Sequence, residues 1–429
     1  MTPDEMAEVR PRLLDFTAEM LGGLARKDQR AAGELYVRGL LTDGQRKSMV
    51  PMAARLGTDH QRLQQFITSS TWDHAAVRRN VARWFASSFP VEALVVDDTG
   101  FPKDGTASPC VARQYSGTLG KTANCQIGVS VHLVNEDASC AAGWRLFCPE
   151  SWDDQALADP VAAAAARRRR QRAGIPDAVR HREKWRLALD MIEEMSGPGG
   201  WGVLDLVTAA GRSRPVVAAD IAYGDNALFR EQLTARGWQY AVAVKGGTTA
   251  YDGGAVPQAR PYGGLGQPPK PAYPAPPVTL RQLAIAHAGQ VQPLTWRQGT
   301  KTSKDNPEAS MTGSFLAIRV RPASRHITRD ADRSYPACWL LAEWPPEADE
   351  PSGYWLSTLP EDSAIEELVR LAKIRWRVEH DYRELKTGLG LDHFEGRSYP
   401  GWHRHVTLAV LAQAFITMIR TDPKAHAPG

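Results

Sequence analysis

The sequence predicts a protein of mixed α+β or α/β class, with an N-terminal helical domain, a core built on a mixed sheet and a mostly β insertion. Apolar residues recur at helical spacing through residues 1–90, and the period changes to that of strands at Val91. A stretch rich in Gly, Pro and Tyr at 248–277 then precedes further strand-like segments. The 429 residues suffice for about two or three domains at roughly 150 residues each.

The composition is that of a globular protein, with 43% hydrophobic and 23% charged residues. No run of eighteen apolar residues occurs and the N-terminus lacks the pattern of a signal peptide, so we expect no membrane span and a cytoplasmic location. The five cysteines are odd in number and show no Cys-x-x-Cys spacing, which indicates reduced thiols. The net charge of +4 does not by itself indicate nucleic acid, but basic residues concentrate at Arg167–Arg170, Arg172, Arg180, Arg182, Lys184 and Arg186.

Five helices are expected in residues 1–90, at about 13–24, 31–41, 44–57 and 61–67 and from Trp72 onward. Asp59 is a candidate N-cap of the fourth helix, and Asp73 stands at the start of the fifth. Short helices separated by Arg and Lys fit a DNA-binding domain of helix-turn-helix type, and they fit a plain helical bundle equally well.

Strands are expected at 91–100, 111–115, 125–134 and 144–147, as a meander of antiparallel strands. The first, VEALVVDDTG, ends in the carboxylates Asp97 and Asp98. The polar loop between the second and third strands carries Arg113, Lys121 and Asn124, which could contact a phosphate or belong to an ordinary hairpin.

A second strand that ends in a carboxylate, Asp220, begins at Val216. A helix at 226–236 and a strand at 238–246 follow, then the exposed loop at 248–277, and then strands at 314–322, 337–344 and 353–359. The tail after Thr421 is expected to be loose.

A final helix, capped by Asp362 or Ser363, places Leu368, Leu371, Ile374, Val378 and Leu385 on one side. Arg375, Glu379, Tyr382 and Lys386 fall on a neighbouring stripe, and Gly388 and Gly390 end the helix. Such a stripe is either a solvated face with ion pairs or a carboxylate placed between two cations for function.

Phosphodiester chemistry offers a reason for two strand-terminal aspartates and a distant glutamate. Two divalent cations roughly 4 Å apart, bridged by carboxylates, activate the attacking oxygen and neutralise the leaving oxygen. Asp97, Asp220 and Glu379 supply oxygen ligands of the kind that Mg²⁺ prefers, with Mn²⁺ expected to substitute. Aspartates at strand ends also serve as helix caps, so the spacing alone leaves both interpretations open.

The segment Arg375-x-x-x-Glu379-x(6)-Lys386, followed by Thr-Gly-x-Gly, resembles the C-terminal signature of bacterial insertion-sequence DDE transposases. The tyrosine that opens the family motif is replaced by Ala372. The blocks DDTGFPKDG, ARQYSGTLGKTANCQ and ADIAYGDN occur in the family's order, and the resemblance covers about residues 10 to 418.

The resemblance implies a ribonuclease H-like core at 91–246 and 361–421, interrupted by the mostly β insertion at 247–360 and preceded by a DNA-binding domain at 1–90. It implies a catalytic and metal-binding triad of Asp97, Asp220 and Glu379, with Asp98 as the alternative to Asp97. Arg375 and Lys386, and further Arg113, Lys121 and Lys103, are expected on DNA.

The resemblance also implies a cytoplasmic, nucleoid-associated homodimer that acts on double-stranded DNA, both the terminal inverted repeats and the target. Two alternatives share the fold: a domesticated DNA-binding regulator without strand transfer and a ribonuclease H-like nuclease. His393, His403 and His405 fit DNA contact or helix packing better than a metal site, and Trp402 fits either base stacking or the core.

Overall fold

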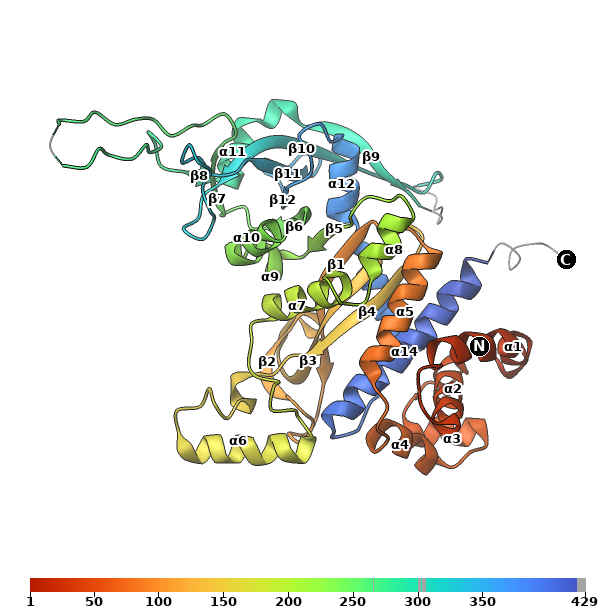
Figure 1. Cartoon of the computed structure of the whole chain (residues 1–429). Coiled ribbons are helices and arrows are strands. Elements are labelled where there is room, and N and C mark those ends of the chain that lie inside the picture. Colours follow the sequence, from red (N-terminus) through yellow and green to blue (C-terminus); the bar gives the residue numbers. More distant parts are fainter. Residues whose placement is uncertain (265, 300–301, 303–305, 423–429) are drawn as a thin grey trace. The chain divides into compact units, whose positions relative to one another are not determined.

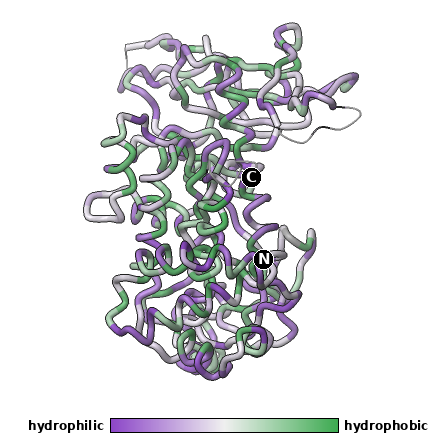
Figure 2. The backbone as a smooth tube through the Cα atoms, turned by 90° about the vertical axis from the view of Figure 1, so that its right-hand side faces the viewer, coloured by the Kyte–Doolittle hydropathy of each residue, from purple (hydrophilic) through white to green (hydrophobic). Residues whose placement is uncertain are grey.

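The computed structural model describes residues 1–264, 266–299, 302 and 306–422. Its internal contacts divide the chain into two compact units, each described here by itself. The first unit contains Met1–Arg214 and the chain from Trp376 onward, and the second contains Pro215–Arg375. Residues 423–429 of the predicted loose tail lie outside the described residues. Hydrophobic stretches recur along the chain in both units (Figure 2).

The first unit begins with five helices, as predicted: α1 (Pro3–Met20), α2 (Lys27–Leu41), α3 (Met49–Leu56), α4 (His60–Thr68) and α5 (His74–Ser88). The carboxylate of Asp59 accepts from the Gln61 amide at the start of α4, and that of Asp73 accepts from the Ala75 amide at the start of α5. These aspartates satisfy amides that the helices themselves leave unpaired. The third helix begins at Met49, later than predicted.

Four antiparallel strands follow: β1 (Ala93–Pro102), β2 (Ala112–Ser116), β3 (Lys121–Val134) and β4 (Ser139–Leu146). The four strands are antiparallel, as predicted, but their order is not that of a meander. The long strand β3 pairs with β1, β2 and β4, so β1 lies beside β3 and not beside β2. Asp97 lies directly opposite Ser130 in the β1–β3 register. Side chains opposite each other in an antiparallel pair share one face of the sheet, so Asp97 and Ser130 do.

The unit continues with α6 (Pro160–Ala173), α7 (Lys184–Ser196) and α8 (Val203–Ala209). The chain returns to it as α13 (Trp376–Arg383), a π-helical turn (Glu384–Gly388) and α14 (Tyr399–Arg420). A Cβ added to Gly143 of β4 would lie 2.4 Å from the Met195 side chain of α7. The absence of a side chain at Gly143 therefore lets α7 pack closely on its face of the sheet.

Helix α14 is buried almost all round and joins the N-terminal helices to the sheet, lying beside α5 and β4 (Figure 1). Phe415 packs against Phe16 of α1, and Arg404 donates to the Ile67 carbonyl at the end of α4. Among the described residues, no helix, α14 included, combines the length and apolar composition that a bilayer crossing requires. All five cysteines are buried and free, as predicted.

The second unit contains a sheet with the order β5-β6-β12-β11-β10-β7-β8, in which β9 also pairs with β10. Strands β5 and β6 are parallel, and β12, β11 and β10 continue antiparallel. The strands are β5 (Val216–Ala219), β6 (Tyr240–Val244), β7 (Thr249–Asp252), β8 (Val278–Thr279), β9 (Gln292–Gln298), β10 (Ser310–Pro322), β11 (Cys338–Trp344) and β12 (Gly353–Ser357). The helices are α9 (Ile221–Gly224), α10 (Ala227–Ala235), α11 (Leu280–Ala286) and α12 (Ile365–Lys373).

The predicted exposed loop at 248–277 is wrong at its start, where β7 pairs with β10. Tyr251 of β7 stacks on Tyr273 with ring centroids 3.7 Å apart, and Tyr273 lies near Tyr335 as well. Aromatic stacking thus fastens the end of the Gly- and Pro-rich stretch to the sheet. Strand β9 and helix α11 were not predicted, since their short segments lack a clear period.

The single predicted C-terminal helix is also wrong, because α12 ends at Lys373 and α13 begins at Trp376. The apolar residues on either side of the break belong to different cores. Val369 and Ala372 of α12 pack with Phe315 and Leu341 in the second unit, whereas α13 packs on the sheet of the first. The N-cap of α12 is Ala364, without a side-chain hydrogen bond, so neither Asp362 nor Ser363 caps it.

Candidate active site

The two adjacent aspartates of β1 point to opposite faces of the sheet, as alternation along a strand requires. Asp97 is 8% exposed, and its Oδ1 accepts from the Asp98 amide at 2.7 Å. Asp98 instead forms an ion pair with Lys184 of α7, with 3.0 Å between Nζ and Oδ2. Asp98 is therefore bound to the helix on its own face, while Asp97 faces the other side.

The helix that carries Glu379 packs on the face of Asp97. Tyr382 of α13 makes a hydrogen bond of 2.7 Å with the hydroxyl of Ser130, the residue opposite Asp97. Burial, and next the charge of Asp97, raise the pKa of Tyr382 well above its ordinary value. Glu379 precedes Tyr382 by three residues, so the two side chains are neighbours on the helix surface. The exposed Glu379 thus stands on the helix face that meets the Asp97 strand.

A buried hydrogen-bond network, the α13 network, holds this helix to the sheet. The Asp381 carboxylate lies 2.6 Å from Nδ1 of His132, and Nε2 of His132 lies 2.9 Å from the Ser130 hydroxyl. Asp381 also accepts from the Ser139 hydroxyl at 2.6 Å and from the Gln413 amide of α14 at 2.9 Å. Every partner fixes the position of α13, so the network sets where Glu379 stands relative to β1.

Reasoning from the sequence missed this network, although a signal for it exists. Ser130 and His132 are two polar residues on one face of the second half of β3, where the opposite face carries only Ile127, Val129, Val131 and Leu133. Buried polar groups require partners, so their spacing indicates a polar element packed above them.

Asp220 lies in the second unit, directly after β5. Its side chain accepts from the Ala222 amide at 3.0 Å and caps the four-residue helix α9. Of the two interpretations of Asp220, helix cap or metal ligand, the local structure therefore confirms the helix cap. A capping aspartate directly after a strand is also held in a fixed direction, which a metal ligand requires.

The cations expected on DNA differ in their surroundings. Lys386 donates to the Gly100 carbonyl at 2.8 Å, and Lys103 donates to the Phe394 carbonyl at 2.7 Å. Burial lowers the pKa of both lysines. Arg113 and Lys121 are exposed and lie on β2 and β3 rather than in a loop, and Arg375 lies in the break between α12 and α13.

The histidines and the tryptophan of the C-terminal segment are packing residues. Trp402 is 1% exposed and meets Phe101 and Trp144 edge to face. His405 is bonded to the hydroxyl of Tyr36, and burial lowers its pKa to about 4. Within the described ranges, no group of three or more His, Cys, Asp and Glu side chains that could hold a metal occurs. Asp97 and Glu379 belong to one unit and Asp220 to the other.

The donors at these three positions fit a hard divalent cation. All are carboxylate oxygens, and Asp97 lies buried beside a tyrosine whose ionisation it opposes. A partly buried carboxylate in such a setting is stabilised by a cation, and Mg²⁺ or Mn²⁺ accepts one or two carboxylates while retaining water.

The antiparallel strands β1 to β4, the parallel β5–β6 pair and the flanking helices define a mixed α and β protein with a ribonuclease H-like core, as predicted. Comparisons with known proteins give the family. The DDE superfamily endonuclease family matches residues 19–303, and the Transposase DDE domain matches residues 198–415. This chain belongs to the DDE superfamily of endonucleases and transposases.

A curated relative supports the same assignment over a shorter stretch. The chain is 35% identical over 100 residues to the probable transposase for insertion sequence element IS701 of Microchaete diplosiphon. The match covers 22% of this chain and 26% of that protein.

Proposed function

We propose that this protein is a DNA transposase that binds the ends of its element, cleaves phosphodiester bonds and transfers the 3′-hydroxyl ends to target DNA. The observation that carries the proposal is the packing of α13, which bears Glu379, on the face of the sheet toward which Asp97 points. Family membership supplies the reaction class.

We assign Asp97, Asp220 and Glu379 as the ligands of two divalent metal ions, Mg²⁺ with Mn²⁺ as a substitute. When bound, the ions would supply a metal-activated hydroxyl nucleophile and neutralise the leaving oxygen. Asp98 is assigned no metal because Lys184 holds it on the opposite face. The α13 network orients Glu379, and the cap at α9 orients Asp220.

Arg375, Lys386, Arg113, Lys121 and Lys103 are the proposed contacts to DNA phosphates. Arg113 and Lys121, exposed on neighbouring strands, are the most accessible of them. Lys386 binds the Gly100 carbonyl of β1 and Lys103 binds the Phe394 carbonyl before α14, so both would act on DNA through their charge and through the position of the backbone that they bind. The helices of residues 1–90 and the insertion at 247–360 are proposed to recognise the inverted repeats.

The proposed partners are double-stranded DNA, as element ends and target, and a second copy of the chain, since two ends must be joined. The proposed location is the cytoplasm, in association with the nucleoid.

The test is strand cleavage and joining on DNA that carries the element's ends, with Mg²⁺, Mn²⁺, Ca²⁺ or a chelator. We expect metal-dependent nicking and joined products from the wild type, and none from Glu379→Gln or Asp220→Asn, with DNA binding retained. Glu384→Gln, five residues further on at the start of the π-helical turn, is the matched control and should cleave normally. Loss with Asp97→Asn but not with Asp98→Asn would identify the first ligand.

Other outcomes would replace the proposal. Cleavage without joined products would indicate a ribonuclease H-like nuclease. Tight binding without cleavage under any condition would indicate a DNA-binding regulator. Normal cleavage by Glu379→Gln would refute the proposed ligands.

A further inference from the structure

A second basic surface lies away from the carboxylates, on helix α6. Residues 160–186 contain nine Arg and Lys against two Asp and Glu, a formal charge of +7 against +4 for the whole chain. The rest of the protein is therefore net negative, and positive charge is concentrated on this segment.

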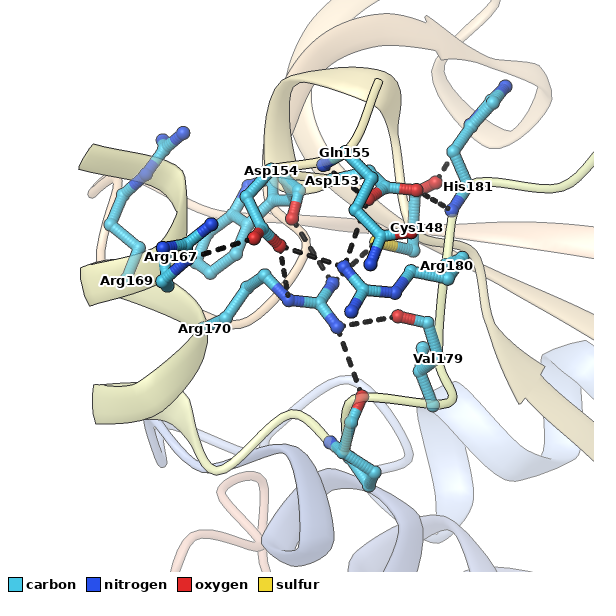
Figure 3. Close-up of polar contacts among 12 residues, drawn as sticks. Cys148, Asp153, Asp154, Gln155, Arg167, Arg169, Arg170, Val179, Arg180 and His181 are labelled. Carbon is cyan, nitrogen blue, oxygen red and sulfur yellow. Dashed lines mark hydrogen bonds and ion pairs between the residues drawn. The ribbon is translucent and has the colours of Figure 1, made fainter. Parts of the chain in front are cut away.

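The arginines of α6 divide into one buried anchor and an outward row. Arg170 is 2% exposed and donates to the carbonyls of Trp152, Pro176 and Val179 (Figure 3). At 100° per residue, Arg168 and Arg172 lie on the side of the helix opposite Arg170, Ala166 and Ala173, and Arg167 lies at the border between the two sides. Arg168 and Arg172 are exposed, whereas Arg170, Ala166 and Ala173 are buried.

A cluster of ion pairs fixes α6 to the chain on both sides of it. The carboxylate of Asp154 forms ion pairs with three arginines (Figure 3). The distances from its oxygens to the guanidinium nitrogens are 2.8 Å for Arg180, 3.1 Å for Arg167 and 3.4 Å for Arg170. Asp153 pairs with Arg180 at 3.2 Å and accepts from the His181 amide at 2.8 Å. The two carboxylates thus face the three guanidinium groups of Arg167, Arg170 and Arg180, so the cluster carries a net positive charge. Its ion pairs hold α6 in place.

Arg168 and Arg172 form no hydrogen bond or ion pair with any residue in the described part of the chain. They stand four residues apart on one face, where like charges repel and destabilise a helix. The repulsion is relieved by an anion that spans both side chains. A rigid helix with paired guanidinium groups, each with forked donors, suits the regularly spaced phosphates of a nucleic acid backbone.

We propose that the outward face of α6, formed by Arg168 and Arg172, is a sequence-independent binding surface for the phosphate backbone of double-stranded DNA. This inference rests on the proposed action on DNA and adds a contact surface separate from the metal ligands. A membrane surface is a poorer occupant, because the apolar side of α6 consists of small alanines that face the protein and cannot enter a bilayer. Backbone contact fixes the position of the DNA without reading its sequence.

The test measures the affinity of the full chain for labelled duplex DNA against salt concentration, with a chelator present to prevent cleavage. Each phosphate contact contributes about 0.9 to the slope of log K against log salt. Arg168→Ala with Arg172→Ala should therefore lower the slope by about 1.8, on element ends and on unrelated DNA alike. Arg168→Lys with Arg172→Lys should retain most of the slope, since the charges remain.

Arg236→Ala is the matched control. Arg236 is an exposed arginine directly after α10 whose guanidinium bonds to Gln232 of that helix, and its loss should leave the slope unchanged. An unchanged slope in the double alanine variant would overturn the inference, as would an equal decrease in the control. A decrease seen only on RNA duplexes would assign the surface to RNA instead.

The two proposals can fail separately. If the wild type binds DNA with the expected slope but never cleaves, the transposase proposal fails and the α6 surface stands. If Glu379→Gln abolishes cleavage while the double alanine variant binds and cleaves like the wild type at every salt concentration, the α6 surface fails alone.

Discussion

Replacing Asp381 by asparagine tests whether the α13 network holds the helix that bears Glu379. The carboxylate side chain is 5% exposed and takes part in hydrogen bonds with His132, Ser139 and Gln413. Asparagine has the same shape, but its side chain is neutral. One of the two carboxylate oxygens becomes an NH₂ group, a donor that would face the donors that now bind the carboxylate. Hydrogen bonds to a buried charge are worth about 1.5–3 kcal/mol each, and breaking a buried pair costs about 3–5 kcal/mol. Since the remaining carbonyl can keep part of the network, we expect a loss of about 3 kcal/mol.

Amide hydrogen exchange, followed by mass spectrometry on peptides from α13 and β3, provides a local readout. A loss of about 3 kcal/mol corresponds to exchange on the order of 100-fold faster in these peptides. Glu384→Gln is the control, because Glu384 pairs with Arg420 of α14 in a contact whose arginine side chain is 61% exposed. That substitution should cost less than about 1 kcal/mol. Equal acceleration in both variants, or no acceleration in Asp381→Asn, would refute the structural role of the network.

Further predictions concern the core, acid stability and DNA contact. Trp402→Ala should cost about 3–5 kcal/mol in denaturant unfolding because a fully buried ring is removed, so a loss below 1 kcal/mol would contradict its place in the core. Gly143→Ala should cost about 1–3 kcal/mol because its Cβ would meet α7, and a neutral effect would show that α7 can shift. The pKa of His405 is about 4 in the folded protein against 6.5 in the unfolded chain, so the unfolded chain binds more protons between these two pH values. Lowering the pH from 6.5 to 4 should therefore reduce the free energy of unfolding by up to about 3 kcal/mol. In His405→Gln, the free energy of unfolding should fall less over the same pH range. Arg375→Ala should weaken DNA binding and lower the salt slope by about 0.9, whereas an unchanged slope would indicate that Arg375 makes no phosphate contact.

Most elements of the fold could be predicted from periodicity, and the failures have identifiable causes. The N-terminal helices and the strands β1 to β4 follow from apolar spacing and from the capping aspartates Asp59 and Asp73, but the pairing of β1 with β3 instead of β2 does not. The continuous helix through Glu379 was wrong because apolar spacing cannot show that consecutive turns face different cores. The four-part division of the chain at residues 90, 246 and 360 stays a prediction.

The candidate site was predictable in its residue types and less so in its local setting. Asp97 and Glu379 were found from strand alternation and from the family motif, but their support by His132 and Asp381 depends on contacts some 250 residues apart in sequence. Likewise, the charge of Lys386 was visible, but its contact with the Gly100 carbonyl was not. Local patterns indicate which groups can react, whereas the hydrogen bonds that orient them come from distant segments of the chain.

The order in which the chain is synthesised gives α14 a further role. The second unit is one continuous segment, so it can fold while the ribosome is still adding the residues beyond it. The first unit cannot, because its N-terminal helices and its sheet both pack on α14, which follows them by more than 180 residues in the sequence. Until α14 emerges, the N-terminal helices expose the apolar surface that α14 will cover, and they depend on chaperones or on partial structure to remain soluble. A nascent chain interrupted before α14 would therefore lack the helix on which the N-terminal helices and the sheet of the first unit both pack.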